Sequence, residues 1–389
     1  MKLLLTHRFY WPDSAPYGAI LRRIAGMLAE HHAVEVFAGV PSYREGVRAP
    51  RIEQDGAVTV RRTWVIPREK RHPVVRALNV LIYCGALFLH VLRVRPDVVM
   101  AATFPPVLAA WSAALAARLV GARFVYHCQD IHPEVSRVSG GALGRGLAFR
   151  LLRWLDNQTL RRAGAIVVLS EDMADTLRAR GLGPLPIHVI NNVAMVGETA
   201  ARPDPAFAKP AGRRRVIFAG NLGVYQELPL LAEGVAKLFP KHPDLELCFI
   251  GSGAAEAGLK AKWEGHAQVR FVPFLPFEAA KPLMAEADLG LVSLLKGMTA
   301  VAYPSKLLTY QALGLPVLAL VEPESALARG LEESGTGVVA RTRSAAGVAE
   351  ALERALADPE MRARAGEQSE AAQAERAHLL WTDLMERLK

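Results

Sequence analysis

Short apolar runs rich in β-branched residues alternate with amphipathic helical patterns along the 389-residue chain. In the first half, the runs predict strands at residues 2–5, 33–38, 58–63, 97–101, 123–127, 165–169 and 188–190. Between them, residues 19–30 show the helical pattern, with an apolar face made of Ile20, Ile24, Met27 and Leu28. Strands that alternate with helices in this way predict parallel β-α-β units.

The alternation breaks after Asn191 and Asn192 into a polar, proline-rich stretch, which we interpret as a linker over residues 194–213. A second series then predicts strands at residues 215–219, 245–250, 269–272, 289–293, 317–320 and 337–339. We therefore predict an α/β protein with two Rossmann-like, doubly wound parallel-sheet domains at residues 1–193 and 214–360 that face a central cleft. The pattern at residues 361–389 predicts one last helix, which could pack back across the domains.

Residues 74–93 form the most apolar segment of the chain, and the approach to it at residues 68–72 is basic. Arg76, Asn79 and His90 interrupt the segment and leave an uncharged run shorter than the ~20 residues that a spanning helix needs. Two interpretations stay open. Residues 68–93 either pack internally as a helix or lie on a membrane interface, with the basic approach facing anionic headgroups.

Composition and charge indicate the cellular compartment of the protein and the chemical class of its partners. The three cysteines, Cys84, Cys128 and Cys248, show no Cys-x-x-Cys spacing, so they indicate neither a disulfide framework nor a zinc site and favour a reducing cytoplasm. The first apolar run is too short for a signal-peptide core. A net charge of +9 suits anionic partners, but the basic clusters lack interleaved aromatic residues, so nucleic acid is the least favoured of them.

The segment around Lys306 places a cation where helix electrostatics disfavour one. Pro304 and Ser305 predict a helix start with Ser305 as N-cap, so Lys306 falls in the first turn. The exposed N–H groups there carry partial positive charge, and a bound anion would reverse the repulsion. Phosphate or diphosphate is the ligand that this arrangement favours, although a solvated lysine is an alternative.

Two glycine turns are expected at the same sheet edge as Lys306. Gly220 follows the strand at 215–219, and Gly251 and Gly253 follow the strand at 245–250. Glycine turns between strand and helix can bring backbone N–H groups against a phosphate, although tight turns that need positive φ would look the same. With the helix start at Lys306, the three turns predict an anion and nucleotide site.

The first domain offers two candidate segments. Gly18 ends the loop 12–18 before a helix, where its N–H could reach a diphosphate. Residues 127–134, with the sequence HCQDIHPE, gather two histidines and two carboxylates at a strand end. Strand alternation puts His127 and Gln129 on one face and Asp130 and His132 on the other, which argues against a metal site. Because the chain has no Asp-x-Asp pair for a metal-bridged diphosphate, Lys306 would have to balance that charge.

Over nearly its whole length, the chain resembles retaining glycosyltransferase family 4 of GT-B fold. It resembles in particular the branch that contains the fucosamine and colanic-acid glycosyltransferases of bacterial surface polysaccharide synthesis. The resemblance rests on the order of the motifs at residues 9–18, 129–134, 168–171, 220–223 with Gln226, 251–253, 304–306 and 314–317.

The resemblance implies a UDP- or GDP-sugar donor held mainly by the C-terminal domain, no further cofactor and no metal. It implies transfer of a hexosyl or N-acetylhexosaminyl group, with retention, to a lipid-linked or oligosaccharide acceptor at the inner face of the cell membrane. Lys306 and Asp130 would be catalytic. The donor would be bound by Gly18, Gly220, Asn221, Gln226, Gly251, Gly253, Ser305, Lys306 and Thr309. The leaving diphosphate would take the acceptor's proton.

The sequence departs from the family pattern at three places. Val301 and Thr309 occupy the positions of the family's paired glutamates. Asn221 and Gln226 replace the basic residues that follow the first glycine loop of the C-terminal domain. Gln129 occupies a position where arginine or histidine is common in the family. Two alternatives therefore stay open beside the transferase. They are a GT-B sugar-nucleotide epimerase and a non-catalytic member that serves as a scaffold.

Overall fold

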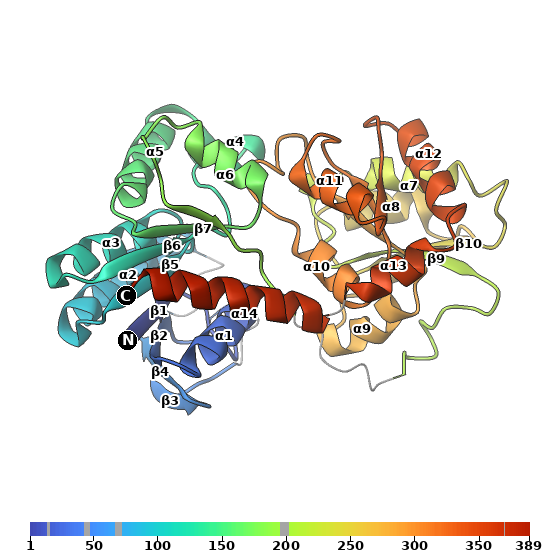
Figure 1. The fold of residues 1–389 in the computed structure, drawn as a ribbon. Coiled ribbons are helices and arrows are strands. Elements are labelled where there is room, and N and C mark those ends of the chain that lie inside the picture. The colour runs from blue at the N-terminus through green and yellow to red at the C-terminus, as the bar shows by residue number, and fades with distance from the viewer. Residues whose placement is uncertain (14–15, 43–46, 67–71, 195–201, 369) are drawn as a thin grey trace. The chain divides into compact units, whose positions relative to one another are not determined.

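The computed structural model describes residues 1–13, 16–42, 47–66, 72–194, 202–368 and 370–389. The chain forms two compact units (Figure 1). Unit 1 comprises Met1–Asn192, Val301–Tyr303 and Arg376–Lys389, and unit 2 comprises Val193–Ala300 and Pro304–Glu375. The chain therefore returns to unit 1 twice after leaving it, once for three residues and once for its C-terminal segment.

Unit 1 is built on an eight-stranded sheet in the order β3-β4-β2-β1-β5-β6-β7-β8. All neighbours are parallel except β3 and β4. The strands are β1 Lys2–Thr6, β2 Ala33–Gly39, β3 Ile52–Asp55, β4 Val58–Thr63, β5 Val98–Ala102, β6 Arg123–His127, β7 Ala165–Val168 and β8 Ile187–Val189. The helices are α1 Pro16–Ala29, α2 Pro73–Val94, α3 Leu108–Val120, α4 Glu134–Val138, the short 3-10 turn η1 Ala142–Gly144, α5 Gly146–Leu160 and α6 Glu171–Arg178.

Unit 2 is built on a six-stranded parallel sheet in the order β11-β10-β9-β12-β13-β14. The strands are β9 Arg214–Ala219, β10 Leu245–Ile250, β11 Val269–Val272, β12 Leu289–Ser293, β13 Val317–Leu320 and β14 Gly337–Val339. The helices are η2 Val224–Gln226, α7 Leu228–Ala236, α8 Glu256–Trp263, α9 Phe277–Ala285, α10 Ser305–Ala312, α11 Ala326–Glu333, α12 Ala345–Leu356 and α13 Met361–Glu367. The prediction of two doubly wound, parallel-sheet domains is confirmed.

The sequence pattern missed one strand in unit 1. Strand β3 pairs antiparallel with β4 across a turn at Gly56 and Ala57, where Gly56 has φ +61°. Its sequence, Ile-Glu-Gln-Asp, is mostly polar because the strand lies at the sheet edge and is partly exposed. The Asp-Gly pair is a strong hairpin signal and could have located this strand.

The prediction of one last helix is wrong, because the C-terminal region forms α13 and α14, the latter at Glu370–Arg387. Helix α13 packs on α10 in unit 2, whereas residues from Arg376 onward belong to unit 1. There the fully buried Trp381 stands edge-on to His127, with ring centroids 5.2 Å apart. The boundary between the units falls inside α14, because residues 370–375 belong to unit 2.

Helix α2 covers the apolar segment that the sequence analysis interprets as a helix at residues 74–93. By length and composition alone, its 22 residues could cross a membrane. One face is nevertheless fixed to unit 1. Asn79 bonds both backbone groups of Ile66 at 2.8 and 2.9 Å, Tyr83 donates to the Phe37 carbonyl at 3.3 Å, and His90 lies 2.5 Å from Glu35. The opposite face exposes Val74, Leu78, Leu81 and Leu89.

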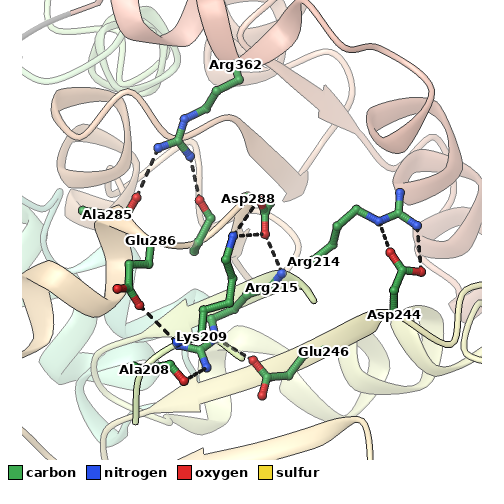
Figure 2. A network of polar contacts seen from close by, with 11 residues as sticks. Ala208, Lys209, Arg214, Arg215, Asp244, Glu246, Ala285, Glu286, Asp288 and Arg362 are labelled. Carbon is green, nitrogen blue, oxygen red and sulfur yellow. Dashed lines mark hydrogen bonds and ion pairs between the residues drawn. The ribbon is translucent and has the colours of Figure 1, made fainter. Parts of the chain in front are cut away.

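A polar network fixes the N-terminal edge of the unit 2 sheet (Figure 2). The buried Arg215 side chain donates to Glu246 at 2.6 Å and to the carbonyls of Phe207 and Ala208 at 3.0 and 3.1 Å. Lys209 reaches both carboxylate oxygens of Asp288 at 3.0 Å. The end of the predicted linker is therefore bonded to unit 2.

We expect breaking the buried pair Arg215–Glu246 to lower the free energy of unfolding far more than breaking the partly exposed pair Arg214–Asp244. Glu246→Leu leaves a fully buried guanidinium short of its carboxylate and should lower the free energy of unfolding by about 3 kcal/mol. Adding Arg215→Met should recover part of that loss. The control Arg214→Met removes the partly exposed pair with Asp244 and should cost less than about 1 kcal/mol. Equal losses for Glu246→Leu and Arg214→Met, measured by chemical denaturation, would contradict this ranking.

Candidate functional site

At the C-terminal edge of the unit 2 sheet, the turns after β9 and β10 are in direct contact. Gly220 and Gly251 have φ +121° and +129°, a region that favours glycine. A Cβ atom at Gly251 would lie 2.0 Å from the carbonyl oxygen of Gly220, and one at Gly253 would lie 2.4 Å from that of Leu222. The two turns therefore form a layer of bare backbone that tolerates no side chain at these positions.

Lys306 lies on this layer. A Cβ atom at Gly220 would stand 3.0 Å from the lysine Cε and 3.4 Å from its Nζ. The Nζ also lies 4.6 Å from the ring centroid of Phe218, the residue before the last of β9. The structure thus brings Gly220, Gly251 and Lys306 together at one sheet edge. Their role in donor binding remains a prediction.

Helix α10 positions Lys306, and it begins at Ser305, one residue before the predicted start at Lys306. Ser305 is the first helical residue and Pro304 is the N-cap, so the prediction that Ser305 caps the helix is wrong. Pro304 has an extended backbone conformation, and no side chain bonds to the N–H groups at the start of the helix. Tyr310 anchors the helix, because its hydroxyl accepts the backbone N–H of Ala219 at 2.9 Å. In the first turn of α10, the N–H of Leu307 bonds the Pro304 carbonyl at 3.1 Å, and no side chain caps the N–H groups of Ser305 and Lys306.

Lys306 is an unusual cation. Burial lowers its pKa from 10.5 to about 8. Among the described residues, no hydrogen-bond acceptor or carboxylate partners its ammonium group. A charged group held in this way carries a desolvation cost that a bound anion would offset. The nearby N–H groups of α10 favour the same kind of ligand.

The other predicted donor residues of unit 2 differ in what their side chains do. Asn221 is exposed, and its amide lies between Gly223 and Gly253, where an added Cβ atom on either would come within 2.8 Å. Gln226 uses its side-chain oxygen to accept the N–H of Gly223 at 3.2 Å. The Thr309 hydroxyl donates to the carbonyl of Ser305 at 3.4 Å. Gln226 and Thr309 therefore contribute to the local structure whether or not they touch a ligand.

A second set of charges at this edge was missed by the sequence analysis. Glu322 accepts the N–H of Gly297 at 2.5 Å and the hydroxyl of Thr299 at 2.8 Å. Arg343 pairs with Glu227 and lies 3.7 Å from Glu322. These residues hold the loop after β12 against those after β9, β13 and β14. Their position just beyond predicted strand ends was a usable signal.

In unit 1, His127 of the 127–134 motif belongs to a buried series of polar contacts. His127 is fully buried, and burial lowers its pKa to about 3, so the ring is neutral. Its Nδ1 lies 2.8 Å from the Tyr17 hydroxyl and its Nε2 lies 2.7 Å from Nε2 of Gln129. Asn192 donates to the Gln129 oxygen at 2.7 Å, which turns the Gln129 NH2 toward His127. His127 and Gln129 therefore lie on one face, as the strand alternation predicts.

Asp130 resembles Lys306 in that burial shifts its pKa in favour of the uncharged form. Burial raises the pKa of its carboxyl group from 3.8 to about 6. No described residue donates a hydrogen bond to that carboxylate in the structure. Its backbone bridges to Ala302, and the next residue, Ile131, donates its N–H to the Val301 carbonyl at 2.7 Å. Asp130 is therefore fixed by its backbone while its side chain keeps an unsatisfied charge.

The remaining residues of the motif, and Gly18, have simpler settings. Arg180 bonds the carboxylate of Glu134 at 2.7 Å and the carbonyl of His132 at 2.9 Å, so this end of the motif is structural. Gly18 is the third residue of α1 and is buried, and its N–H belongs to the unpaired first turn. Residues 14 and 15 of the predicted loop lie outside the described residues.

The 127–134 motif does not gather metal ligands in the described part of the chain. There, the three metal-ligating atoms found within 4.8 Å of one another come from Glu30, His31 and His378. These residues lie in unit 1, away from the motif in sequence.

Two family models match the chain, mainly one on each unit. Residues 17–193 match the glycosyl transferase 4-like domain, and residues 213–358 match the glycosyl transferases group 1 domain. Each unit therefore matches a glycosyltransferase domain model, and the two parallel-sheet domains fit a GT-B fold.

A curated relative supports this GT-B assignment. The protein described as "Probable glycosyltransferase WbjE" from Pseudomonas aeruginosa is 30% identical over 251 residues, which cover 62% of this chain and 62% of the relative. The chain thus spans less than two thirds of that relative's length.

Solved structures agree on the GT-B fold. A sucrose-phosphate synthase from Thermosynechococcus elongatus superposes with a TM-score of 0.73 at 15% identity, covering 99% of both chains. Anabaena HepE in complex with UDP gives 0.65 at 16% identity, also covering 99% of both. At these identities the likeness concerns the fold alone.

Gly251→Ala should damage the fold of unit 2. The added methyl group would meet the Gly220 carbonyl oxygen at 2.0 Å in a backbone conformation that alanine rarely adopts. We expect a loss of about 2–4 kcal/mol in the free energy of unfolding. The matched control is Gly258→Ala in α8, where an added Cβ has nothing within 4 Å. That change should stabilise by about 0.5–1 kcal/mol, and equal behaviour of the two variants would refute the close contact.

Lys306→Met should stabilise the ligand-free protein in a pH-dependent way. Because the folded-state pKa of about 8 lies below the ordinary 10.5, the cost of the buried charge is complete below about pH 8 and disappears as pH rises toward 10.5. We expect a gain of about 1–3 kcal/mol near pH 7 that shrinks toward about pH 10. Unfolding curves at several pH values test this. A gain that does not depend on pH would point to packing instead of charge.

Proposed function

We propose that the chain is a retaining glycosyltransferase that moves a hexosyl or N-acetylhexosaminyl group from a nucleotide sugar to a lipid-linked or oligosaccharide acceptor. The pathway would be bacterial exopolysaccharide, O-antigen or capsule synthesis. The domain pair and the WbjE relative support a glycosyltransferase. One observation carries the donor assignment. It is the unpaired ammonium of Lys306 on the bare backbone of Gly220 and Gly251.

In this proposal, unit 2 binds the donor diphosphate. Lys306 and the first turn of α10 supply positive charge, and the glycine turns let the phosphates approach the backbone. The base would be uracil or guanine. The UDP complex of the structural neighbour HepE is consistent with the former. Gly18 would offer its N–H to the same diphosphate.

The proposed reaction needs no protein base. The bond from the anomeric carbon to the diphosphate breaks and a bond to the acceptor oxygen forms on the same face. The acceptor's proton passes to the leaving diphosphate, so charge and atoms balance. Lys306 would stabilise the negative charge that grows on the diphosphate oxygen. Asp130, whose pKa near 6 leaves it mostly ionised at neutral pH, would contact the acceptor.

The two positions of the missing glutamates do not restore a carboxylate. Val301 is buried and uses its carbonyl in unit 1, and the hydroxyl of Thr309 bonds its own helix. The sugar would therefore be held without those carboxylates. This departure is the observation that favours a second candidate, a non-catalytic scaffold, and it leaves the epimerase as a third.

We further propose that the protein is cytoplasmic and peripheral on the inner face of the membrane, with contact through residues 68–93. The exposed Val74, Leu78, Leu81 and Leu89 on α2 support such a contact. Residues 68–71 of the basic approach lie outside the described residues. Because the other face of α2 is bonded to unit 1, the helix would lie along the surface and not cross it.

Donor binding provides the test of the proposed function. UDP or GDP should raise the thermal unfolding midpoint, and Lys306→Met should weaken that ligand by roughly 10- to 100-fold through loss of a charged hydrogen bond. Affinity should also fall above about pH 8, where Lys306 loses its proton. The control Lys237→Met removes an exposed lysine on the same unit and should change nothing.

The outcomes separate the candidates. Unchanged nucleotide binding and transfer by Lys306→Met would sink the mechanism. Turnover of a sugar nucleotide without acceptor, followed by NMR of the sugar, would identify an epimerase. Absence of stabilisation by any UDP- or GDP-sugar would favour the scaffold.

A further inference from the structure

Three helices of unit 1 share an apolar outer surface. Helix α3 contacts α2 on one side and α5 on the other, so the three form one layer (Figure 1). Large apolar side chains are exposed on all of them, namely Val74, Leu78, Leu81 and Leu89 of α2, Leu119 of α3, and Leu147, Leu151 and Trp154 of α5. Single exposed leucines are ordinary, but a series across neighbouring helices indicates an interaction surface.

Helix α5 carries the most exposed part of this surface. Leu147, Leu151 and Trp154 are spaced four and three residues apart, so they lie on one face of the helix. Their exposed fractions are 81%, 58% and 56%. The opposite face is occupied by Phe149, Asp156 and Leu160, which are buried in unit 1. The exposed apolar face is therefore additional to the face that builds the fold.

The charge beside this apolar face has one sign. Arg150 and Arg153 lie on α5, and Arg145 precedes it. The one acidic residue of Gly146–Leu160, Asp156, is buried and bonded to Arg180 at 2.5 Å and to Tyr126 at 2.8 Å. Arg153 lies 3.7 Å from Glu134, a carboxylate that Arg180 already binds. The surface thus presents cations next to leucines and a tryptophan.

A pocket of about 490 Å³ opens among these cations. It is lined by Arg137, Phe149, Arg150, Arg153, Trp154 and Asn157. The guanidinium of Arg137 is stacked over the ring of Phe149 at 3.6 Å, which holds its charge at the pocket wall. The volume lies within the range of roughly 300–1,000 Å³ that small-ligand sites occupy. Three guanidinium groups favour an anion, and guanidinium geometry suits phosphate in particular.

We propose that α5 and this pocket dock on an anionic lipid bilayer. A lipid headgroup phosphate binds between Arg137, Arg150 and Arg153, while Leu147, Leu151 and Trp154 enter the interface beside it. The apolar side chains around the pocket favour a phosphate attached to lipid over a free one. Interfacial helices combine these residue types, with tryptophan at the level of the headgroups. The inference rests on the proposed membrane-surface role and adds a second contact to α2, with a defined headgroup site.

Vesicle binding by the full-length protein tests the proposal. With phosphatidylcholine vesicles containing phosphatidylglycerol, Arg150→Gln with Arg153→Gln should weaken binding by roughly 10- to 30-fold at low salt. The control pair Arg48→Gln with Arg51→Gln removes the same charge from exposed positions before β3 and should have a much smaller effect. Equal losses for the two pairs would overturn the pocket as a specific site and leave only net charge.

The apolar contact needs its own readout. Leu147→Gln with Leu151→Gln should weaken binding even to saturating anionic vesicles, whereas Leu379→Gln, exposed on α14, should not. Brominated lipids should quench tryptophan fluorescence, and Trp154→Phe should remove most of that quenching. Unchanged binding by the leucine pair, or quenching that persists in Trp154→Phe, would contradict insertion.

Two further measurements separate this proposal from the others. Inorganic phosphate at millimolar concentration should not displace the protein from vesicles, and complete displacement would indicate a site for free phosphate. All α5 variants should keep the nucleotide binding of the wild type. Loss of donor binding with intact vesicle binding refutes the proposed function alone, whereas vesicle binding that depends on α2 but not on α5 refutes this inference alone.

Discussion

The contact between the Gly220 and Gly251 turns is the constraint on which the candidate donor site depends. With 2.0 Å between an added Cβ and the neighbouring carbonyl oxygen, no side chain fits between the two turns. The backbone is therefore exposed where a polar ligand could approach it, and Lys306 can lie flat on Gly220. Tyr310 locks the arrangement, since its hydroxyl bonds the last residue of β9 while its ring packs on Gly290. The close contact between the two turns and the position of the α10 N-terminus beside them therefore depend on one another.

Lys306 differs from the paired charges that occur at both edges of the unit 2 sheet. At the N-terminal edge, Arg215, Glu246 and Asp288 are paired, and the pairs stabilise the fold. At the C-terminal edge, Lys306 is partly buried and no described carboxylate or hydrogen-bond acceptor partners its ammonium group. In unit 1, Asp130 is partly buried and no described residue donates a hydrogen bond to its carboxylate. Burial moves both pKa values toward neutrality, which is a cost to stability. Groups that a fold keeps at such a cost are candidates for chemistry.

Much of the fold could be predicted from the sequence because its signals are local. Buried parallel strands are apolar runs, and the turns that follow them carry glycine or charge, so the edge that holds Gly220, Gly251 and Lys306 was visible. What was missed depends on contacts between distant residues. The pairing of Arg343 with Glu227 and Glu322 leaves no periodic trace in the sequence. The helical pattern of residues 361–389 likewise does not mark where α13 ends and α14 begins. Strand β3 was missed since edge strands need not be apolar.

The C-terminal segment has a consequence for how the protein is made. Trp381 completes the cover of His127, and the last residues up to Lys389 lie in unit 1, where the Lys389 carbonyl accepts from Arg123 at 2.9 Å. During synthesis, unit 1 begins to emerge from the ribosome before unit 2 but is completed only after it. Until residues 376–389 appear, its central histidine lacks the tryptophan that covers it. A fragment that stops at the first boundary between the units would remain in that unfinished state.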